Sequence, residues 1–263
     1  MTDSGATKRV IIKRDPDVLA EYVATRFVNR IVKRVAEGKR MHICLTGGTM
    51  GGAVLRTAAR DARLTEIDWS LVHFWFGDER FVPRDSDDRN EKQAREAFLD
   101  ALDIPAENIH AVASSDGDLD LDAAAIAYAD ELAQFAPADR SESGPWPSFD
   151  ICFLGVGPDA HIASLFPDRA EISVTDRATV PVRDSPKPPS ERVSLTRPVI
   201  NSSKRVWMVI AGADKAAALG LALAGASYQS VPAAGAKGRR RTAFFVDESA
   251  ADQVPPQLID REY

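Results

Sequence analysis

Short apolar runs rich in β-branched and aromatic residues alternate along the chain with longer segments whose apolar positions recur every three or four residues. The short runs predict strands, and the longer segments predict helices that each bury one face. We predict strands at residues 9–13, 41–46, 71–76, 149–154, 178–183, 206–211 and 242–247. We predict helices that open at Asp15-Pro16 and that span about 53–60, 90–102, 121–135 and 213–224.

This alternation of strands and helices indicates the fold class. It predicts a doubly wound α/β fold, in which helices cover both faces of a mostly parallel sheet. Ligands bind beyond the carboxyl ends of the strands in such sheets, so residues that follow a strand are candidates for a functional site. The sequence shows no internal repeat, and we expect residues 1–263 to form a single domain. Residues 136–148, rich in Pro, Ser and Gly, predict a surface connection.

Composition narrows the class of partner. Hydrophobic residues make up 44% of the chain and charged residues 27%, which is typical of a globular protein. A net charge of -6 argues against general binding of nucleic acid, because phosphate backbones attract positive surfaces. The one basic run, residues 237–241, is expected to be a solvated loop.

The sequence also predicts a cytoplasmic protein. Cys44 and Cys152 each lie in an apolar run, so we expect buried, reduced thiols. The first ten residues lack the apolar region of a signal peptide. Asp214 and Lys215 interrupt the most apolar late stretch, residues 206–226, so neither a transmembrane span nor a membrane partner is predicted. The oligomeric state stays open.

Two segments that follow predicted strands carry candidate chemistry. Residues 46–52 place four glycines before a helix, where backbone N–H groups approach an anion and the helix N-terminus adds positive potential. No Gly-Lys-Ser/Thr ends this segment, so it is not a Walker A loop, and alone it fits a ligand-free turn equally well. Gly77-Asp78-Glu79-Arg80 offers an arginine that suits a phosphate, although a solvated surface explains these charges more simply when they are taken alone.

A third segment, Gly155-Val156-Gly157-Pro158-Asp159-Ala160-His161, contains a formal GxGxxA pattern. It is not a dinucleotide site, because it lies in mid-chain, holds a proline in the turn and leaves too few residues before Pro167 for the helix that a pyrophosphate needs. An Asp and a His two residues apart remain, on a loop where a ligand binds. His161 is equally compatible with acid–base catalysis and with a structural role.

Arg192 and Lys215 are further candidate cations, and Lys215 lies at a helix start after a strand. Alone, each is explained as a surface charge. The sequence contains no His-x-x-His, no Cys-x-x-Cys and no Gly-x-Ser-x-Gly, so neither a metal site nor a serine nucleophile is predicted. Together the segments predict acid–base chemistry on a phosphorylated metabolite.

Four blocks resemble the 6-phosphogluconolactonase family in residues and in order. They are Leu45-Thr46-Gly47-Gly48-Thr49, the stretch 76–83 with Asn90, the stretch 155–167, and the stretch 185–189 through Arg192 to Gly212 and Lys215. The resemblance implies a fold shared with glucosamine-6-phosphate deaminases, a sugar-phosphate substrate, hydrolysis of 6-phosphoglucono-1,5-lactone in the pentose phosphate pathway, and no cofactor.

The resemblance also implies roles for individual residues. His161 is the catalytic residue and Asp159 its motif neighbour. Gly47, Gly48, Thr49, Asp78, Glu79, Arg80, Arg192 and Lys215 are the implied substrate- and phosphate-binding residues. The chain departs from the family at Ala160, where Gly is usual, and at Ile162, where Thr is usual. Because Ala160 carries a β-carbon, we expect its φ not to be positive.

Two alternatives share the fold. A glucosamine-6-phosphate deaminase or ketose isomerase would place a Glu after the histidine, whereas residues 163–167 read Ala-Ser-Leu-Phe-Pro. A non-catalytic sugar-phosphate sensor would carry an N-terminal helix-turn-helix, for which the roughly ten residues before the first predicted strand are too few.

Overall fold

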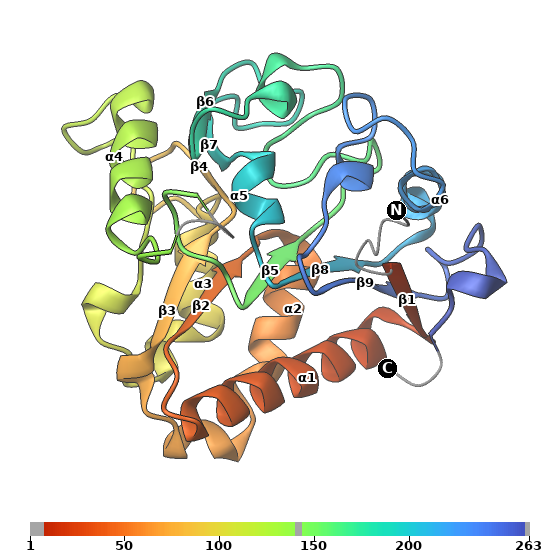
Figure 1. The fold of residues 1–263 in the computed structure, drawn as a ribbon, viewed down its shortest axis with the longest axis horizontal. Coiled ribbons are helices and arrows are strands. Elements are labelled where there is room, and N and C mark those ends of the chain that lie inside the picture. Colours follow the sequence, from red (N-terminus) through yellow and green to blue (C-terminus); the bar gives the residue numbers. More distant parts are fainter. Residues whose placement is uncertain (1–7, 140–143, 261–263) are drawn as a thin grey trace.

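The computed structural model describes residues 8–139 and 144–260. Its main sheet has six parallel strands in the order β1-β9-β8-β5-β2-β3 (Figure 1). These strands are β1 (Lys8–Lys13), β2 (Met41–Leu45), β3 (Val72–Phe76), β5 (Ile151–Leu154), β8 (Arg205–Ile210) and β9 (Arg241–Asp247). The predicted α/β class with a mostly parallel sheet is confirmed, and all six parallel strands lie within two residues of their predicted bounds.

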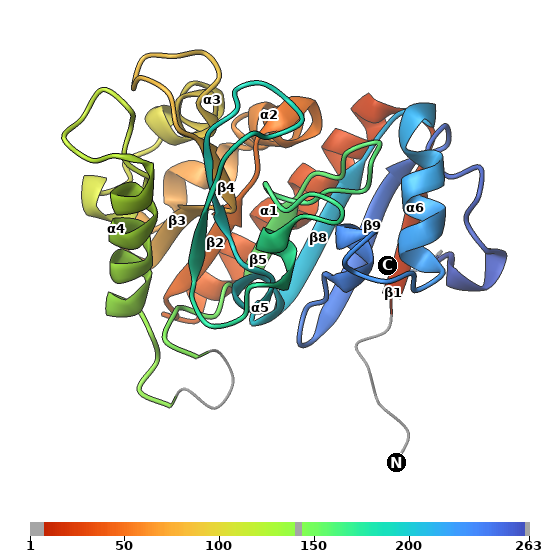
Figure 2. The same cartoon turned by 90° about the horizontal axis from the view of Figure 1, so that it is seen from above.

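Helices cover both faces of this sheet, as Figure 2 shows from above. They are α1 (Pro16–Ala36), α2 (Gly48–Ala58), α3 (Asn90–Ala97), α4 (Leu121–Gln134), α5 (Arg197–Asn201) and α6 (Ala216–Leu223). Successive residues of a strand enter different cores. Phe153 packs with α1 to α3, whereas Leu154 packs with α4 to α6. Burial of both side-chain sets explains why central strands such as β5 are apolar throughout rather than alternating.

A second sheet has three antiparallel strands in the order β4-β7-β6. They are β4 (Asp78–Arg80), β7 (Arg192–Leu195) and β6 (Thr179–Val182). Only β6 lies where a strand is predicted, and it belongs to this smaller sheet. The β4–β7 pairing joins Asp78 to Ser194 and Arg80 to Arg192. Two of the predicted cationic residues therefore lie side by side although they are far apart in the sequence.

Several predicted bounds are wrong. α2 begins at Gly48 instead of residue 53, so most of the glycine-rich segment is helix and not loop. α3 ends at Ala97 instead of residue 102, because Phe98 leaves the helical region with φ -155° and a short 3-10 turn follows. Asp15 caps α1 as expected, its side chain accepting a hydrogen bond from the Val18 N–H. The predicted connection at 136–148 lies partly outside the described residues.

Candidate functional site

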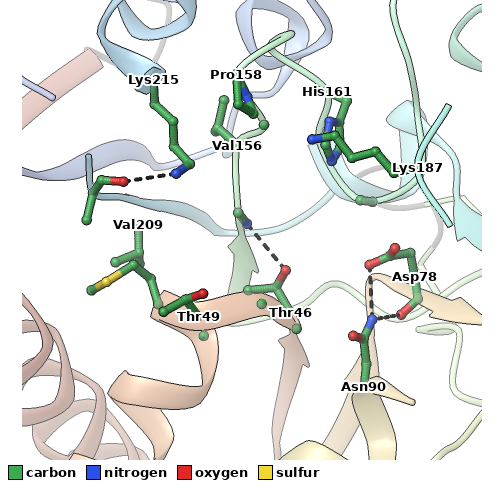
Figure 3. Close-up of a pocket in the computed structure, with 18 of the residues that line it drawn as sticks. Thr46, Thr49, Asp78, Asn90, Val156, Pro158, His161, Lys187, Val209 and Lys215 are labelled. Atoms are coloured by element: carbon green, nitrogen blue, oxygen red, sulfur yellow. Dashed lines mark hydrogen bonds between the residues drawn. The ribbon is translucent and has the colours of Figure 1, made fainter. Parts of the chain in front are cut away.

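A cavity of about 500 Å³ opens beyond the carboxyl ends of the parallel strands, where an α/β sheet binds its ligands (Figure 3). It is lined by the start of α1, the residues after β2, β5 and β8, the small sheet and the loop around Lys187. Eight of the ten predicted site residues line it, namely Gly47, Gly48, Thr49, Asp78, Arg80, His161, Arg192 and Lys215. Asp159 and Glu79 do not line the cavity.

The N-terminus of α2 forms part of the cavity wall. The residue that caps it, Gly47, has no side chain to accept a hydrogen bond from the first turn, and Thr46 to Gly51 all line the cavity. The first N–H groups of an α-helix have no partner within the helix, and the helix dipole gives them a partial positive charge. This wall therefore suits an anionic group such as a phosphate.

His161 and Asp159 form a pair on the loop after β5. His161 Nδ1 lies 2.6 Å from Asp159 Oδ1, so an Nδ1–H tautomer donates to the carboxylate and leaves Nε2 for proton transfer. Burial lowers the pKa of His161, although the hydrogen bond to Asp159 opposes this effect. Burial favours a higher pKa for Asp159, but the hydrogen bond from His161, the nearby charges of His161 and Lys187 and a backbone hydrogen bond together outweigh it, so the pKa of Asp159 is lowered. At neutral pH the pair is thus a neutral imidazole beside a carboxylate, which is the form of a general base.

Close packing holds this pair against its own loop. A β-carbon placed on Gly157 would lie 2.2 Å from His161 Nδ1 and 2.4 Å from Asp159 Oδ1, so only glycine lets both side chains lie where they do. The ring centroid of Phe166 lies 4.7 Å from that of the histidine. The position of His161 is therefore set by the backbone beneath it and by its carboxylate partner.

The expectation for Ala160 is wrong. Its φ is +67°, and Ala163 has φ +48°. Two backbone hydrogen bonds hold Ala160 in place, from its own N–H to the Gly157 carbonyl at 2.9 Å and from the Ala233 N–H to its carbonyl at 3.0 Å. For an L-residue this left-handed conformation costs about 1–2 kcal/mol, which the surrounding bonds offset. These bonds impose the left-handed conformation on residue 160 although it is alanine and not glycine.

Asp78 lies at the junction of three segments. Its Oδ2 accepts a 2.7 Å hydrogen bond from Ser164 Oγ and lies 3.9 Å from Arg192 Nη1. Asn90 donates to the Asp78 carbonyl oxygen at 2.8 Å. This network ties the loop after His161 to the small sheet and to the start of α3.

Glu79 serves α3 rather than the cavity. The residue is 0% exposed, and its carboxylate accepts hydrogen bonds from the N–H groups of Arg80, Asn90 and Glu91. Burial raises the pKa of Glu79 to about 7, against the opposing effects of Arg89 and of those N–H groups. Its place in the structure is that of a helix cap, which positions Asn90.

Asn90 in turn holds Arg80. The Arg80 Nη1 group donates to Asn90 Oδ1 and to the Asp88 carbonyl, each at 2.8 Å. Asn90 packs so tightly on the segment after β2 that a β-carbon on Gly47 would lie 1.8 Å from Asn90 Oδ1. One amide therefore positions a cation, a carboxylate and the start of α2 around the same cavity.

Arg192 is 4% exposed, and its guanidinium bonds mainly to backbone carbonyl groups of the preceding loop. Nε donates to the Pro189 carbonyl, and Nη2 donates to the carbonyls of Lys187 and Pro188, at 3.0–3.1 Å. It thereby fixes the loop that carries Lys187, whose Nζ lies 3.8 Å from Asp159 Oδ1 and which lines the cavity. Figure 3 shows Lys187 beside His161 and Lys215 on the other side of the cavity. Lys215 Nζ donates to the Ala211 carbonyl at 3.0 Å.

Sequence reasoning missed the structural importance of Asn90, Ser164 and Lys187. All three residues lie within the blocks that carry the family resemblance, so that signal was present in the sequence. The other three histidines, His42, His73 and His110, stack together away from the cavity. Burial lowers the pKa of His42 to about 3 and that of His73 to about 4. His42 and His73 are therefore neutral at neutral pH.

The described ranges, 8–139 and 144–260, contain neither a cluster of metal ligands nor a membrane-spanning helix. Within those ranges, His, Cys, Asp and Glu side chains form no group of three or more that would hold a metal ion. The same ranges contain no helix with the length and apolar character needed to cross a membrane.

The sequence is similar to those of known proteins. A 6-phosphogluconolactonase of Streptomyces coelicolor is 42% identical over 254 residues, which are 96% of this chain and 97% of the relative. A 6-phosphogluconolactonase of Mycobacterium tuberculosis is 46% identical over 243 residues, or 92% and 96% of the two chains.

Solved structures agree with these sequence relatives. The 6-phosphogluconolactonase of Trypanosoma brucei matches with a TM-score of 0.82 at 26% identity, covering 95% of this chain and all of its own. That of Thermotoga maritima matches with a TM-score of 0.78 at 27% identity, covering 92% and 100%. Residues 14–245 match the family described as Glucosamine-6-phosphate isomerases/6-phosphogluconolactonase, and the chain therefore belongs to that family.

Proposed function

We propose that this chain hydrolyses 6-phospho-D-glucono-1,5-lactone to 6-phospho-D-gluconate, in the oxidative pentose phosphate pathway. The observation that carries the proposal is one cavity lined both by an anion-binding wall and by His161, whose Nδ1 is hydrogen-bonded to Asp159. Relatives at 42–46% identity named 6-phosphogluconolactonase support the same reaction. The chain is thus an enzyme, a carboxylic ester hydrolase that acts on a lactone.

Substrate binding follows from the charges that line the cavity. The N-terminus of α2 accepts the phosphate, and Arg80 and Lys215 supply cations next to it. Because Lys215 and His161 lie on different sides of the cavity, a phosphate near Lys215 leaves the lactone ring to extend toward the histidine (Figure 3). Arg192 fixes the loop of Lys187 and also lines the cavity, so the phosphate contact expected of it from the sequence stays a prediction.

His161 transfers protons in both steps of the reaction. A water attacks the lactone carbonyl carbon while Nε2 takes its proton, and the carbonyl oxygen becomes an oxyanion. The tetrahedral intermediate then collapses, the bond between that carbon and the ring oxygen breaks, and Nε2 returns the proton to the ring oxygen. Asp159 keeps the ring in the Nδ1–H tautomer and stabilises its charged form. The Lys187 ammonium, near this pair, stabilises the oxyanion.

This mechanism uses water and side chains, and it needs no cofactor. Cys44 and Cys152 are buried free thiols, which supports a cytoplasmic location for the enzyme. The binding partner that we propose for this chain is its small sugar-phosphate substrate.

A coupled assay tests the proposal. Fresh 6-phosphogluconolactone is supplied, 6-phosphogluconate dehydrogenase reports the product, and the spontaneous rate without enzyme is subtracted. We expect a rate above background that falls about 10²–10⁴-fold in His161→Asn, while 6-phosphogluconate still binds the variant. Ammonia release from glucosamine 6-phosphate without lactone hydrolysis would instead identify a deaminase. A folded His161→Asn protein that retains most of its kcat would contradict the assigned base and point to Asp159.

A further inference from the structure

Two residues of the loop after β5 have left-handed backbone conformations and lie on either side of the catalytic histidine in the sequence. Ala160 has φ +67° and Asp168 has φ +57°. Neither residue lines the catalytic cavity. An L-residue keeps such a conformation only where the surrounding structure imposes it. The contacts that hold these two residues therefore decide where this loop, and the histidine within it, lies.

Both residues are held by one segment of the chain that lies between α6 and β9. The Ala233 N–H donates to the Ala160 carbonyl at 3.0 Å, and the Asp168 N–H donates to the Gln229 carbonyl at 2.7 Å. The Ser230 hydroxyl also donates to Asp168 Oδ1 at 2.9 Å. One short segment, distant in the sequence, thus holds the loop on both sides of the histidine.

This clamp segment, residues 229–233, is itself fixed by packing. Residues 231–233 are buried. Just after the segment, a β-carbon placed on Gly235 would lie 2.5 Å from the β-carbon of Tyr228, so the backbone packs closely there. The Gly235 carbonyl also accepts a hydrogen bond from Asn201 Nδ2 at 2.9 Å. Because the clamp segment has its own partners, it can impose a conformation on the loop that it contacts.

We propose that the clamp segment positions His161 for proton transfer, through its bonds to Ala160 and Asp168. Ala160 joins Asp159 to His161, so its backbone torsions set how the carboxylate and the imidazole face each other. Residues of the clamp segment do not line the cavity, so they act on the placement of the base and not on the substrate. The inference rests on the proposed function, in which His161 transfers the protons.

The bond to Asp168 acts on the packing of the imidazole. Asp168 closely follows Phe166, whose ring centroid lies 4.7 Å from that of His161. Aspartate tolerates a left-handed conformation better than most residues, because its short side chain accepts local hydrogen bonds. Here that side chain accepts its bond from Ser230 of the clamp segment. Loss of this bond would release the turn after Phe166, and with it the ring that packs on the histidine.

Gly235→Ala tests the bond to Ala160. Because the atom at 2.5 Å is the β-carbon of Tyr228, the backbone must shift by at least about 0.5 Å to reach the 3.0 Å that real contacts observe. A misplacement of about 1 Å costs on the order of 10²-fold in rate, so we expect kcat to fall about 10-fold. Affinity for 6-phosphogluconate should stay within twofold. The matched control is Gly117→Ala, whose β-carbon would meet nothing closer than 3.5 Å and which should keep kcat within twofold.

Three variants test the bond to Asp168. Asp168→Ala removes the acceptor and should lower kcat about 10-fold. Asp168→Asn keeps an acceptor oxygen and tolerates the left-handed conformation, so it should retain kcat within twofold. Ser230→Ala should lower kcat about threefold in the wild-type background and leave Asp168→Ala unchanged, because the bond is already absent there. These variants also decide the question if Gly235→Ala does not fold.

An NMR titration of the His161 imidazole separates this proposal from the lactonase assignment, because it needs no turnover. The resonance is identified by its absence from His161→Asn. The hydrogen bond to Asp159 raises the pKa of His161, so the pKa should be lower in Gly235→Ala than in the wild type and unchanged in Gly117→Ala. A lowered pKa in a protein without lactonase activity would leave the positioning intact and refute the proposed function.

Two outcomes would overturn the positioning role. One is a folded Gly235→Ala or Asp168→Ala protein whose kcat and histidine titration both match the wild type. The other is a loss of 6-phosphogluconate affinity as large as the loss of kcat, which would mean that the whole cavity is disturbed. Thermal unfolding establishes that each variant is folded.

Discussion

Gly157→Ala tests the idea that the loop backbone sets the position of the catalytic base. The added β-carbon would lie 2.2 Å from His161 Nδ1, and side-chain β-carbons essentially never approach another atom closer than 3.0 Å. The imidazole or the loop must therefore shift by at least about 0.8 Å, which separates Nδ1 from Asp159 or misaligns Nε2. A misplacement of about 1 Å costs on the order of 10²-fold in rate. We expect kcat to fall about 10²-fold with KM changed less than threefold, because the phosphate-binding wall is untouched.

Gly155→Ala provides the matched control for this measurement. It lies two residues earlier in the same loop and also lines the cavity, but its added β-carbon would meet nothing closer than Thr46 Oγ1 at 3.9 Å. This variant should retain kcat within about twofold. Both proteins are measured in the coupled assay, with thermal unfolding to establish that each is folded. The reasoning is refuted if folded Gly157→Ala keeps its kcat, or if both variants lose activity equally.

Four further predictions follow from the site. Burial lowers the pKa of His161, so log kcat should rise with pH through one ionisation below 6.5, as the neutral imidazole forms. This rise should be absent from the pH profile of His161→Asn. A rise that persists in the variant would belong to another ionisable group. Asn90→Ala should raise KM about 10-fold by releasing the arginine and carboxylate that Asn90 holds, whereas Lys92→Ala, on the same helix, should leave steady-state kinetics unchanged. Calorimetry with 6-phosphogluconate should show binding weakened about 10- to 100-fold in Lys215→Ala and unchanged in Lys237→Ala. Equal affinity of the two variants would mean that the phosphate does not bind at Lys215. Dialysis against a chelator should leave activity intact; loss that zinc or magnesium restores would refute metal-free catalysis.

The amino-acid sequence by itself determined the order of parallel strands and helices. Apolar runs such as 149–154 must be buried on both sides, and the local periodicity around them distinguishes helix from strand. It also indicated His161, Arg80 and Lys215, because the carboxyl ends of parallel strands meet at one edge of a sheet. These are consequences of short-range pattern and of a general rule of topology, so they needed no coordinates.

Only the tertiary structure decided what depends on contacts between distant residues. The pairing of β4 with β7 places Arg80 beside Arg192. No local sequence pattern predicts β4 as a strand, because all three of its residues are charged. The left-handed φ of Ala160 is imposed by hydrogen bonds, one of them to residue 233, which override its own preference. Arg30 of α1 and Arg205 of β8 line one hollow although about 175 residues separate them in the sequence. These two charges lie close together because α1 packs on the sheet. The sequence around either residue does not indicate that contact.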